Sequence, residues 1–258
     1  MDPEWQDFME DIIETVAFEK ETIKLNLAQE DIIPQIISHH KKIGIDISES
    51  AYINNFNKAI CTNTFSIIKE NKDKIVESSP FDEAIFDKQL NTGIGQTSPD
   101  FFLSNDKVII GIVSKFTEML ETKSPNHENY LQNFIDRKEL EYLPKGYDKF
   151  LDYYMNLREN LFLDISQLIE LSVGLLNYKN SKKAGILYIY WTPSNYHNIP
   201  IYEKHFSEVE SFKSKMNSFL SFRAISYDKF WSFYQEDVNF QEQFTSLKNI
   251  YNIELQAV

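Results

Sequence analysis

The chain has 258 residues, of which 42% are hydrophobic and 14% aromatic, and its formal net charge is −13. That apolar share supports a folded core and excludes disorder as the main state. A single cysteine, Cys61, excludes a disulfide framework and a zinc site built from cysteines. No stretch approaches the roughly 18 apolar residues of a membrane span, and the acidity weighs against broad nucleic-acid binding. We therefore expect a soluble, cytoplasmic globular protein.

Residues 1–78 predict an N-terminal helical region, placed before a main domain over residues 79–258. A second helix is expected from about Asp31 to Gly44, with Pro34 in its first turn. A third helix is expected to begin at Ser48 as its N-cap. The first helix is predicted by one apolar stripe at helical spacing, made of Trp5, Phe8, Met9, Ile12, Ile13 and Val16.

The pattern changes near residue 80. Residues 81–90 predict a short helix. Two short apolar runs then follow, over residues 100–103 and 108–113, and the polar residues 104–107 between them suit a turn. We therefore expect a β-hairpin at this place.

The second half of the chain alternates helices and strands. Residues 164–178 and 205–220 predict helices, residues 184–191 and 222–225 predict strands, and a last helical stretch begins near Tyr227. A further helical piece is expected around residues 130–140. The predicted fold class is α/β (α+β), with a mixed β-sheet flanked by helices on both faces and an N-terminal helical extension.

The hairpin carries the residues most suited to chemistry. Asp100 opens its first strand and Lys115 ends its second, so the two are expected to meet at one end of paired strands. A carboxylate there can hold a hard divalent cation, and a lysine beside it can position water and stabilise charge on a phosphate.

These segments resemble the PD-(D/E)XK nuclease superfamily, which includes many restriction endonucleases. The likeness covers residues 80–235, and its hairpin lies in residues 98–103 and 110–118. It continues through a helix at residues 166–177, a strand at 187–193 and a segment at 222–231. The resemblance implies a restriction-endonuclease-like fold and a Mg²⁺- or Mn²⁺-dependent nuclease, with Asp100 as metal ligand and Lys115 and Gln167 facing the active site.

One position departs from the superfamily pattern. The acidic residue that normally stands two positions before the lysine is replaced by Val113. Glu83, expected on the helix before the hairpin, and Glu118, just after the lysine, are the two candidates for the missing metal-binding carboxylate. Ordinary roles stay open as well: Asp100 also suits a turn cap, and Lys115 also suits an exposed strand end.

Three functions follow from these observations. The first is a DNA endonuclease of restriction or defence type, expected to act as a homodimer because a duplex has two strands to cut. The second is a catalytically degenerate relative that binds a protein partner through its acidic surface or N-terminal helices. The third is a purely helical scaffold, which predicts little strand content. No membrane association is expected.

Overall fold

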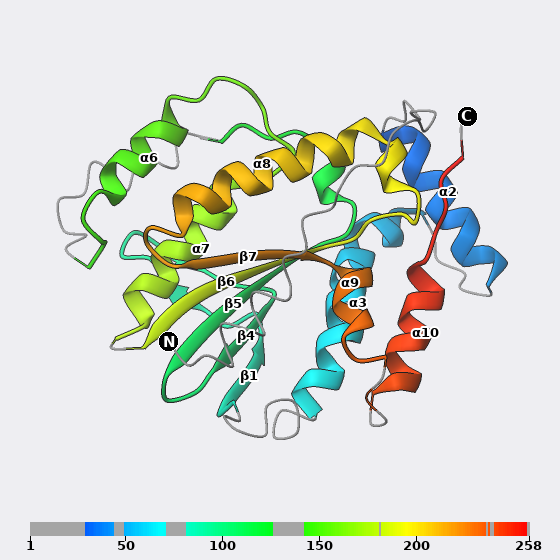
Figure 1. Cartoon of the computed structure of the whole chain (residues 1–258), viewed down its shortest axis with the longest axis horizontal. Coiled ribbons are helices and arrows are strands. Elements are labelled where there is room, and N and C mark those ends of the chain that lie inside the picture. The colour runs from blue at the N-terminus through cyan, green and yellow to red at the C-terminus, as the bar shows by residue number, and fades with distance from the viewer. Residues whose placement is uncertain are drawn as a thin grey trace.

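The protein folds around a five-stranded mixed β-sheet, seen in the computed structural model of Figure 1. The structure describes residues 29–43, 49–70, 81–125, 142–180, 182–235, 237 and 240–256. The expected helices at residues 5–16 and around 130–140, and the expected N-cap Ser48, lie outside these residues.

The sheet has the order β1-β4-β5-β6-β7. Its first three strands form an antiparallel meander, made of β1 (Glu83–Phe86), β4 (Phe101–Ser104) and β5 (Val108–Lys115). The next two, β6 (Lys183–Tyr190) and β7 (Ser221–Ser226), run parallel to β5. A small second sheet pairs β2 (Leu90–Asn91) with β3 (Gln96–Thr97). The observed strands exclude the purely helical scaffold and confirm a mixed α/β architecture.

Helices cover both faces of the sheet (Figure 1). One core lies under α6 (Tyr147–Met155), α7 (Ile165–Tyr178) and α8 (Pro200–Met216). The other lies under α2 (Gln29–Lys42), α3 (Glu49–Glu70), α9 (Tyr227–Ser232) and α10 (Gln241–Tyr251). Alternation along the strands divides the apolar residues between the two cores: Ile112 belongs to the α3 side and Val113 to the α7 side.

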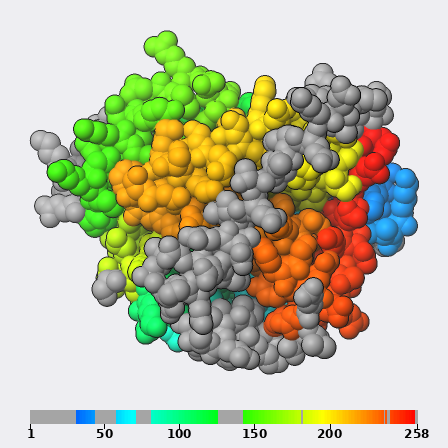
Figure 2. All heavy atoms as spheres, in the orientation of Figure 1, coloured from blue at the N-terminus to red at the C-terminus, as the bar shows by residue number. Residues whose placement is uncertain are grey.

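The helices α2 and α3 share their core with the sheet. The Phe65 ring of α3 stacks on Phe101 of β4 at 5.1 Å between centroids. The Gln35 side chain of α2 donates to the main-chain oxygen of Gln256 at 3.0 Å and accepts from its N–H at 2.7 Å. Figure 2 shows the same closeness of α2, in blue, to the red C-terminal residues. A domain boundary near residue 78 stays a prediction.

The prediction of a helix over residues 81–90 is wrong. Residues 83–86 form β1, which pairs antiparallel with β4 from Glu83↔Ser104 to Phe86↔Phe101. This short run suits either state by local preference, and pairing with a strand distant in sequence decides the outcome.

The other elements agree with the sequence in type and differ at their ends. The hairpin, α7, β6 and β7 are confirmed, and β5 ends at Lys115 as expected. The helix expected at residues 205–220 begins earlier, with Pro200 in its first turn. The helix α2 begins at Gln29, so Pro34 lies in its second turn instead of its first. No described helix is long and apolar enough to cross a lipid bilayer.

Candidate functional site

The strand β5 is longer than its neighbour β4, and two carboxylates accept hydrogen bonds from N–H groups at its unpaired end. The last pair of the ladder joins Phe101 to Ile112, and β5 then continues to Lys115. The N–H of Ser114 donates to the Asp100 carboxylate at 2.7 Å. The N–H of Phe116 donates to the Glu118 carboxylate at 2.9 Å. Because N–H groups two residues apart point to the same edge of a strand, both carboxylates lie along the edge that β4 leaves open.

The register places Asp100 on the same side of the sheet as Lys115. Asp100 comes just before Phe101, which pairs with Ile112, so Asp100 is level with Val113 of β5. The side chains of Val113 and Lys115 point to the same face of the sheet, because they are two residues apart on one strand. The two side chains are close enough for Lys115 to lower the pKa of Asp100, and they do not form an ion pair within 4.0 Å.

Burial dominates the ionisation of Asp100. Desolvation raises the pKa of its carboxyl, and the negative charge of Glu118 raises it further. The hydrogen bond from Ser114 and the charge of Lys115 offset only part of this. Two carboxylates that repel each other, one of them mostly buried, form a site that a cation would stabilise.

Lys115 is only 7% exposed and points into a narrow recess. Glu118, Lys123, Asp164 and Tyr188 also line this recess. No residue in the described part of the chain forms an ion pair with Lys115. The free space of the recess does not admit a water-sized sphere.

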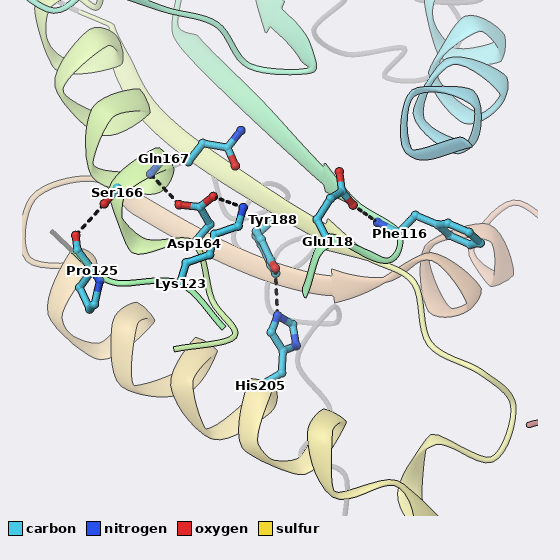
Figure 3. Close-up of polar contacts among 9 residues, drawn as sticks. All are labelled: Phe116, Glu118, Lys123, Pro125, Asp164, Ser166, Gln167, Tyr188 and His205. Atoms are coloured by element: carbon cyan, nitrogen blue, oxygen red, sulfur yellow. Dashed lines mark hydrogen bonds and ion pairs between the residues drawn. The ribbon is translucent and has the colours of Figure 1, made fainter. Parts of the chain in front are cut away.

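An ion pair closes the recess from the side of α7. The Lys123 ammonium lies 2.7 Å from the Asp164 carboxylate, and Figure 3 shows this pair and Glu118 on either side of Tyr188. Burial alone would raise the pKa of Asp164, but the hydrogen bond from Lys123 and the charges of Lys115 and Lys123 bring it below its ordinary value. Asp164 is therefore an anion that two lysines stabilise.

A glycine brings α7 close to β5. A Cβ atom on Gly111 would lie 3.1 Å from a methyl group of Leu175 and 3.3 Å from Leu171, so α7 packs directly over this strand. Asp164 caps α7 by accepting from the N–H of Gln167 at 3.1 Å. The helix N-terminus thereby comes to the end of β5 that carries Lys115.

Gln167 points from α7 over the sheet (Figure 3). Its side-chain oxygen is buried and has no hydrogen-bond partner in the described part of the chain. An acceptor left unpaired in this way is costly and is available to a donor that enters the site.

The structure does not bring Glu83 to this group. Glu83 is on β1 opposite Ser104, at the turn end of the hairpin. Four residues of strand separate that level from Asp100, which is roughly 13 Å at about 3.3 Å per residue. Glu83 instead pairs with Lys88 at 3.2 Å and accepts from the Tyr178 hydroxyl at 3.4 Å.

Val113 is part of the core beneath α7 and is 1% exposed. The second carboxylate near Lys115 therefore comes from Glu118, at the start of the 3₁₀ turn Glu118–Leu120. Mg²⁺ is commonly held by one or two carboxylates, with water and substrate phosphate completing its shell. Asp100 and Glu118 fit that requirement, although no group of three or more His, Cys, Asp or Glu residues in the described ranges is placed to hold an ion.

Sequence reasoning missed Asp164, Lys123 and the buried pair of Tyr188 and His205. The Tyr188 hydroxyl lies 2.9 Å from Nε2 of His205 beneath the recess (Figure 3). Asp164 carried a signal, since Asp before an apolar helix predicts an N-cap. Lys123 carried none, because it comes from an irregular segment 41 residues before its partner.

Comparison with known proteins adds no family to this description. No protein-family profile, curated protein or solved structure matches the chain. The superfamily resemblance therefore stays an interpretation of the sequence.

Proposed function

We propose that the protein is a metal-dependent nuclease that hydrolyses phosphodiester bonds in DNA. The observation that carries this proposal is the pair of carboxylates, Asp100 and Glu118, which accept from N–H groups at the end of β5 and just after it, beside the buried side chain of Lys115. The order of hairpin, helix α7 and parallel strand β6 also agrees with the order that the superfamily resemblance implies.

Each residue has a distinct part in this proposal. Asp100 and Glu118 would hold Mg²⁺ or Mn²⁺, and the ion would polarise the phosphate and acidify the attacking water. Lys115 is placed to stabilise the negative charge that develops on the phosphate, since a desolvated ammonium acts strongly on charge beside it. The unpaired oxygen of Gln167 can accept a hydrogen bond from the attacking water.

Cleavage of plasmid DNA and of a labelled single-stranded oligonucleotide, each in Mg²⁺ and in EDTA, tests the proposal. We expect Asp100→Asn and Lys115→Met to lower the rate by at least about 100-fold, the scale of losing one electrostatic contact in an active site. Asp106→Asn and Lys107→Met change the same residue types at exposed positions of the hairpin turn and should retain the wild-type rate. Absence of cleavage by the wild type, or full activity of Asp100→Asn, contradicts the proposal.

A second candidate is a degenerate nuclease fold that binds a protein partner. Two observations favour it: Val113 is packed in the core where an acidic residue is expected, and the recess beside Lys115 is too narrow for water. The net charge of −13 also suits a basic protein partner better than a nucleic acid. If this candidate holds, the wild type shows no thermal shift in Mg²⁺ and Val113→Glu gains one. Mg²⁺ binding by the wild type that Asp100→Asn abolishes contradicts it.

Cutting both strands of a duplex would require two copies of this site. We therefore propose a homodimer on DNA, which light scattering with and without a duplex oligonucleotide measures.

A further inference from the structure

A large cavity lies beside the candidate site and not within it. Its volume is about 740 Å³, which is within the range of sites that hold small organic ligands. It opens at the carboxyl ends of β6 and β7, where Tyr190, Trp191 and Ser226 line it. Ligands of open α/β sheets commonly bind outside the carboxyl ends of parallel strands.

The sheet register connects this cavity to Lys115. Lys115 of β5 is level with Tyr190 of β6, and Tyr190 is level with Ser226 of β7. Neighbouring strands lie about 4.8 Å apart, so the cavity begins within roughly 5 to 10 Å of Lys115. A nucleic-acid strand with its scissile phosphate at Lys115 would reach the cavity within a few nucleotides, since stacked nucleotides rise about 3.4 Å each.

Three lysines from three helices converge on the cavity. Lys213 comes from α8, Lys229 from α9 and Lys248 from α10. Lys213 pairs with Glu210 at 3.1 Å and Lys248 pairs with Asp228 at 3.0 Å. Both acidic partners are more than half exposed, and exposed pairs of this kind contribute little to stability. A phosphate could therefore replace either carboxylate at small cost.

Aromatic side chains face the same space. Tyr196, in the 3₁₀ turn Tyr196–Asn198, is partly buried and packs edge-to-face on Phe206 of α8 at 5.4 Å between centroids. Both rings line the cavity. An aromatic ring beside lysines is the combination that stacks a base and neutralises its phosphate.

We propose that this cavity binds a nucleotide unit, with the base against Tyr196 and the phosphate among Lys213, Lys229 and Lys248. The unit is either part of a single strand that continues to Lys115 or a free nucleotide. The first form rests on the proposed nuclease function, and the second does not.

Fluorescence anisotropy in EDTA, which prevents metal-dependent cleavage, tests both forms. The probes are a 5′-fluorescein-labelled dT₁₂ and a fluorescent derivative of AMP. Replacing all three lysines by alanine should reduce the slope of log K against log [salt] for dT₁₂ binding by about 0.7, since the lysines hold one phosphate and each phosphate neutralised on a single strand contributes about 0.7. The matched control replaces Lys107, Lys145 and Lys149, which are exposed and do not line the cavity, and should retain the wild-type slope.

Two further variants keep the test independent of the triple substitution. Tyr196→Ala should weaken binding by about five- to hundredfold, the range for losing one stacked base, and Tyr196→Phe should restore it. Glu210→Gln combined with Asp228→Asn should tighten binding, because it removes the carboxylates that compete for the lysines.

The two probes identify the source of the ligand. Sensitivity of dT₁₂ alone to these variants supports the substrate strand, and sensitivity of the AMP probe supports a free nucleotide. If neither probe binds, or if binding is unchanged by both Tyr196→Ala and the lysine variant, the inference is wrong. Cavity-dependent binding by a protein that cleaves no DNA would overturn the nuclease proposal alone, while cleavage unaffected by the cavity variants would overturn the substrate-strand form of this inference alone.

Discussion

Replacing Asp100 separates its two roles, as a hydrogen-bond acceptor for Ser114 and as a charge for a cation. Asp100→Asn retains an oxygen that can accept from the Ser114 N–H, whereas Asp100→Ala leaves that N–H without its acceptor. An unpaired buried N–H costs about 1–3 kcal/mol, so we expect Asp100→Ala to lose about that much stability.

The hydrogen bond to Asp100 stabilises the fold, whereas the negative charge of its buried carboxylate destabilises it. Burial raises the pKa of Asp100 in the folded protein, so its favourable contribution is present below the ordinary carboxyl pKa and is lost as the pH rises through the folded value. At pH 7.5 in EDTA, Asp100→Asn should therefore be at least as stable as the wild type, with Asp100→Ala the least stable of the three.

Magnesium should reverse the order of wild type and Asp100→Asn. With a Kd of about 1 mM, 10 mM Mg²⁺ would stabilise the wild type by about 1.4 kcal/mol, from RT ln(1 + [L]/Kd). For a chain of this size that is roughly 3–6 °C in Tm, and Asp100→Asn should show no such shift.

Differential scanning fluorimetry of the three proteins and of Asp106→Asn, in EDTA and in 10 mM Mg²⁺, measures all of these values. The reasoning is refuted if Mg²⁺ raises the Tm of Asp100→Asn as much as that of the wild type. It is also refuted if Asp100→Asn is clearly less stable than the wild type in EDTA, because the charge would then stabilise the fold without a cation.

Three predictions concern the surroundings of the site. The Ser114 Oγ and Tyr227 hydroxyl lie 2.6 Å apart in the core, so urea unfolding of Ser114→Ala, Tyr227→Phe and the double variant should give a coupling of about 1 kcal/mol; additive losses would contradict the contact. A Cβ on Gly174 would lie 2.7 Å from the Thr97 methyl, so Gly174→Ala should cost about 1–3 kcal/mol in urea unfolding, and Thr97→Ser, which removes that methyl, should recover part of it. Burial lowers the pKa of His205 to about 3, so its contribution is present above pH 6.5 and lost as the pH falls toward 3. Between pH 6.5 and 5 the free energy of unfolding should fall by about 2 kcal/mol for this reason, and His205→Asn should lack this fall. If the urea midpoint of His205→Asn depends on pH as that of the wild type does, the imidazole protonates freely in the folded protein.

Local chemistry made part of the fold predictable. The turn of the hairpin forms because the Asn105 side chain accepts from the N–H groups of Lys107 and Val108, both at 2.9 Å, which is the capability that predicts Asn in turns. The helix α7 begins where its N-cap residue predicts. The strand β1 was not predictable in this way, because its four residues become a strand only by pairing with β4.

The residues of the candidate site also differ in how far the sequence predicts them, according to whether their contacts are local. Asp100 and Lys115 lie at the ends of a local hairpin, so the sequence predicts their proximity. Glu118 joins them because its side chain turns back to the Phe116 N–H, a contact that depends on where β4 begins. Lys123 reaches Asp164 through an irregular segment, and no periodicity marks such a contact in advance.

The balance of charge around the recess favours a cation over a purely structural role for the carboxylates. Strand-end amides need only an acceptor oxygen, which a neutral Asn or Ser supplies without the cost of burying a charge. The site instead gathers three carboxylates, Asp100, Glu118 and Asp164, around two ammonium groups, Lys115 and Lys123, for a local charge of −3 + 2 = −1. One divalent cation would change this to +1, and one phosphodiester would then bring it to zero. Because a sheet that only caps its own amides has no need of that excess negative charge, a cation-dependent gain in stability is the measurement on which the nuclease proposal depends most directly.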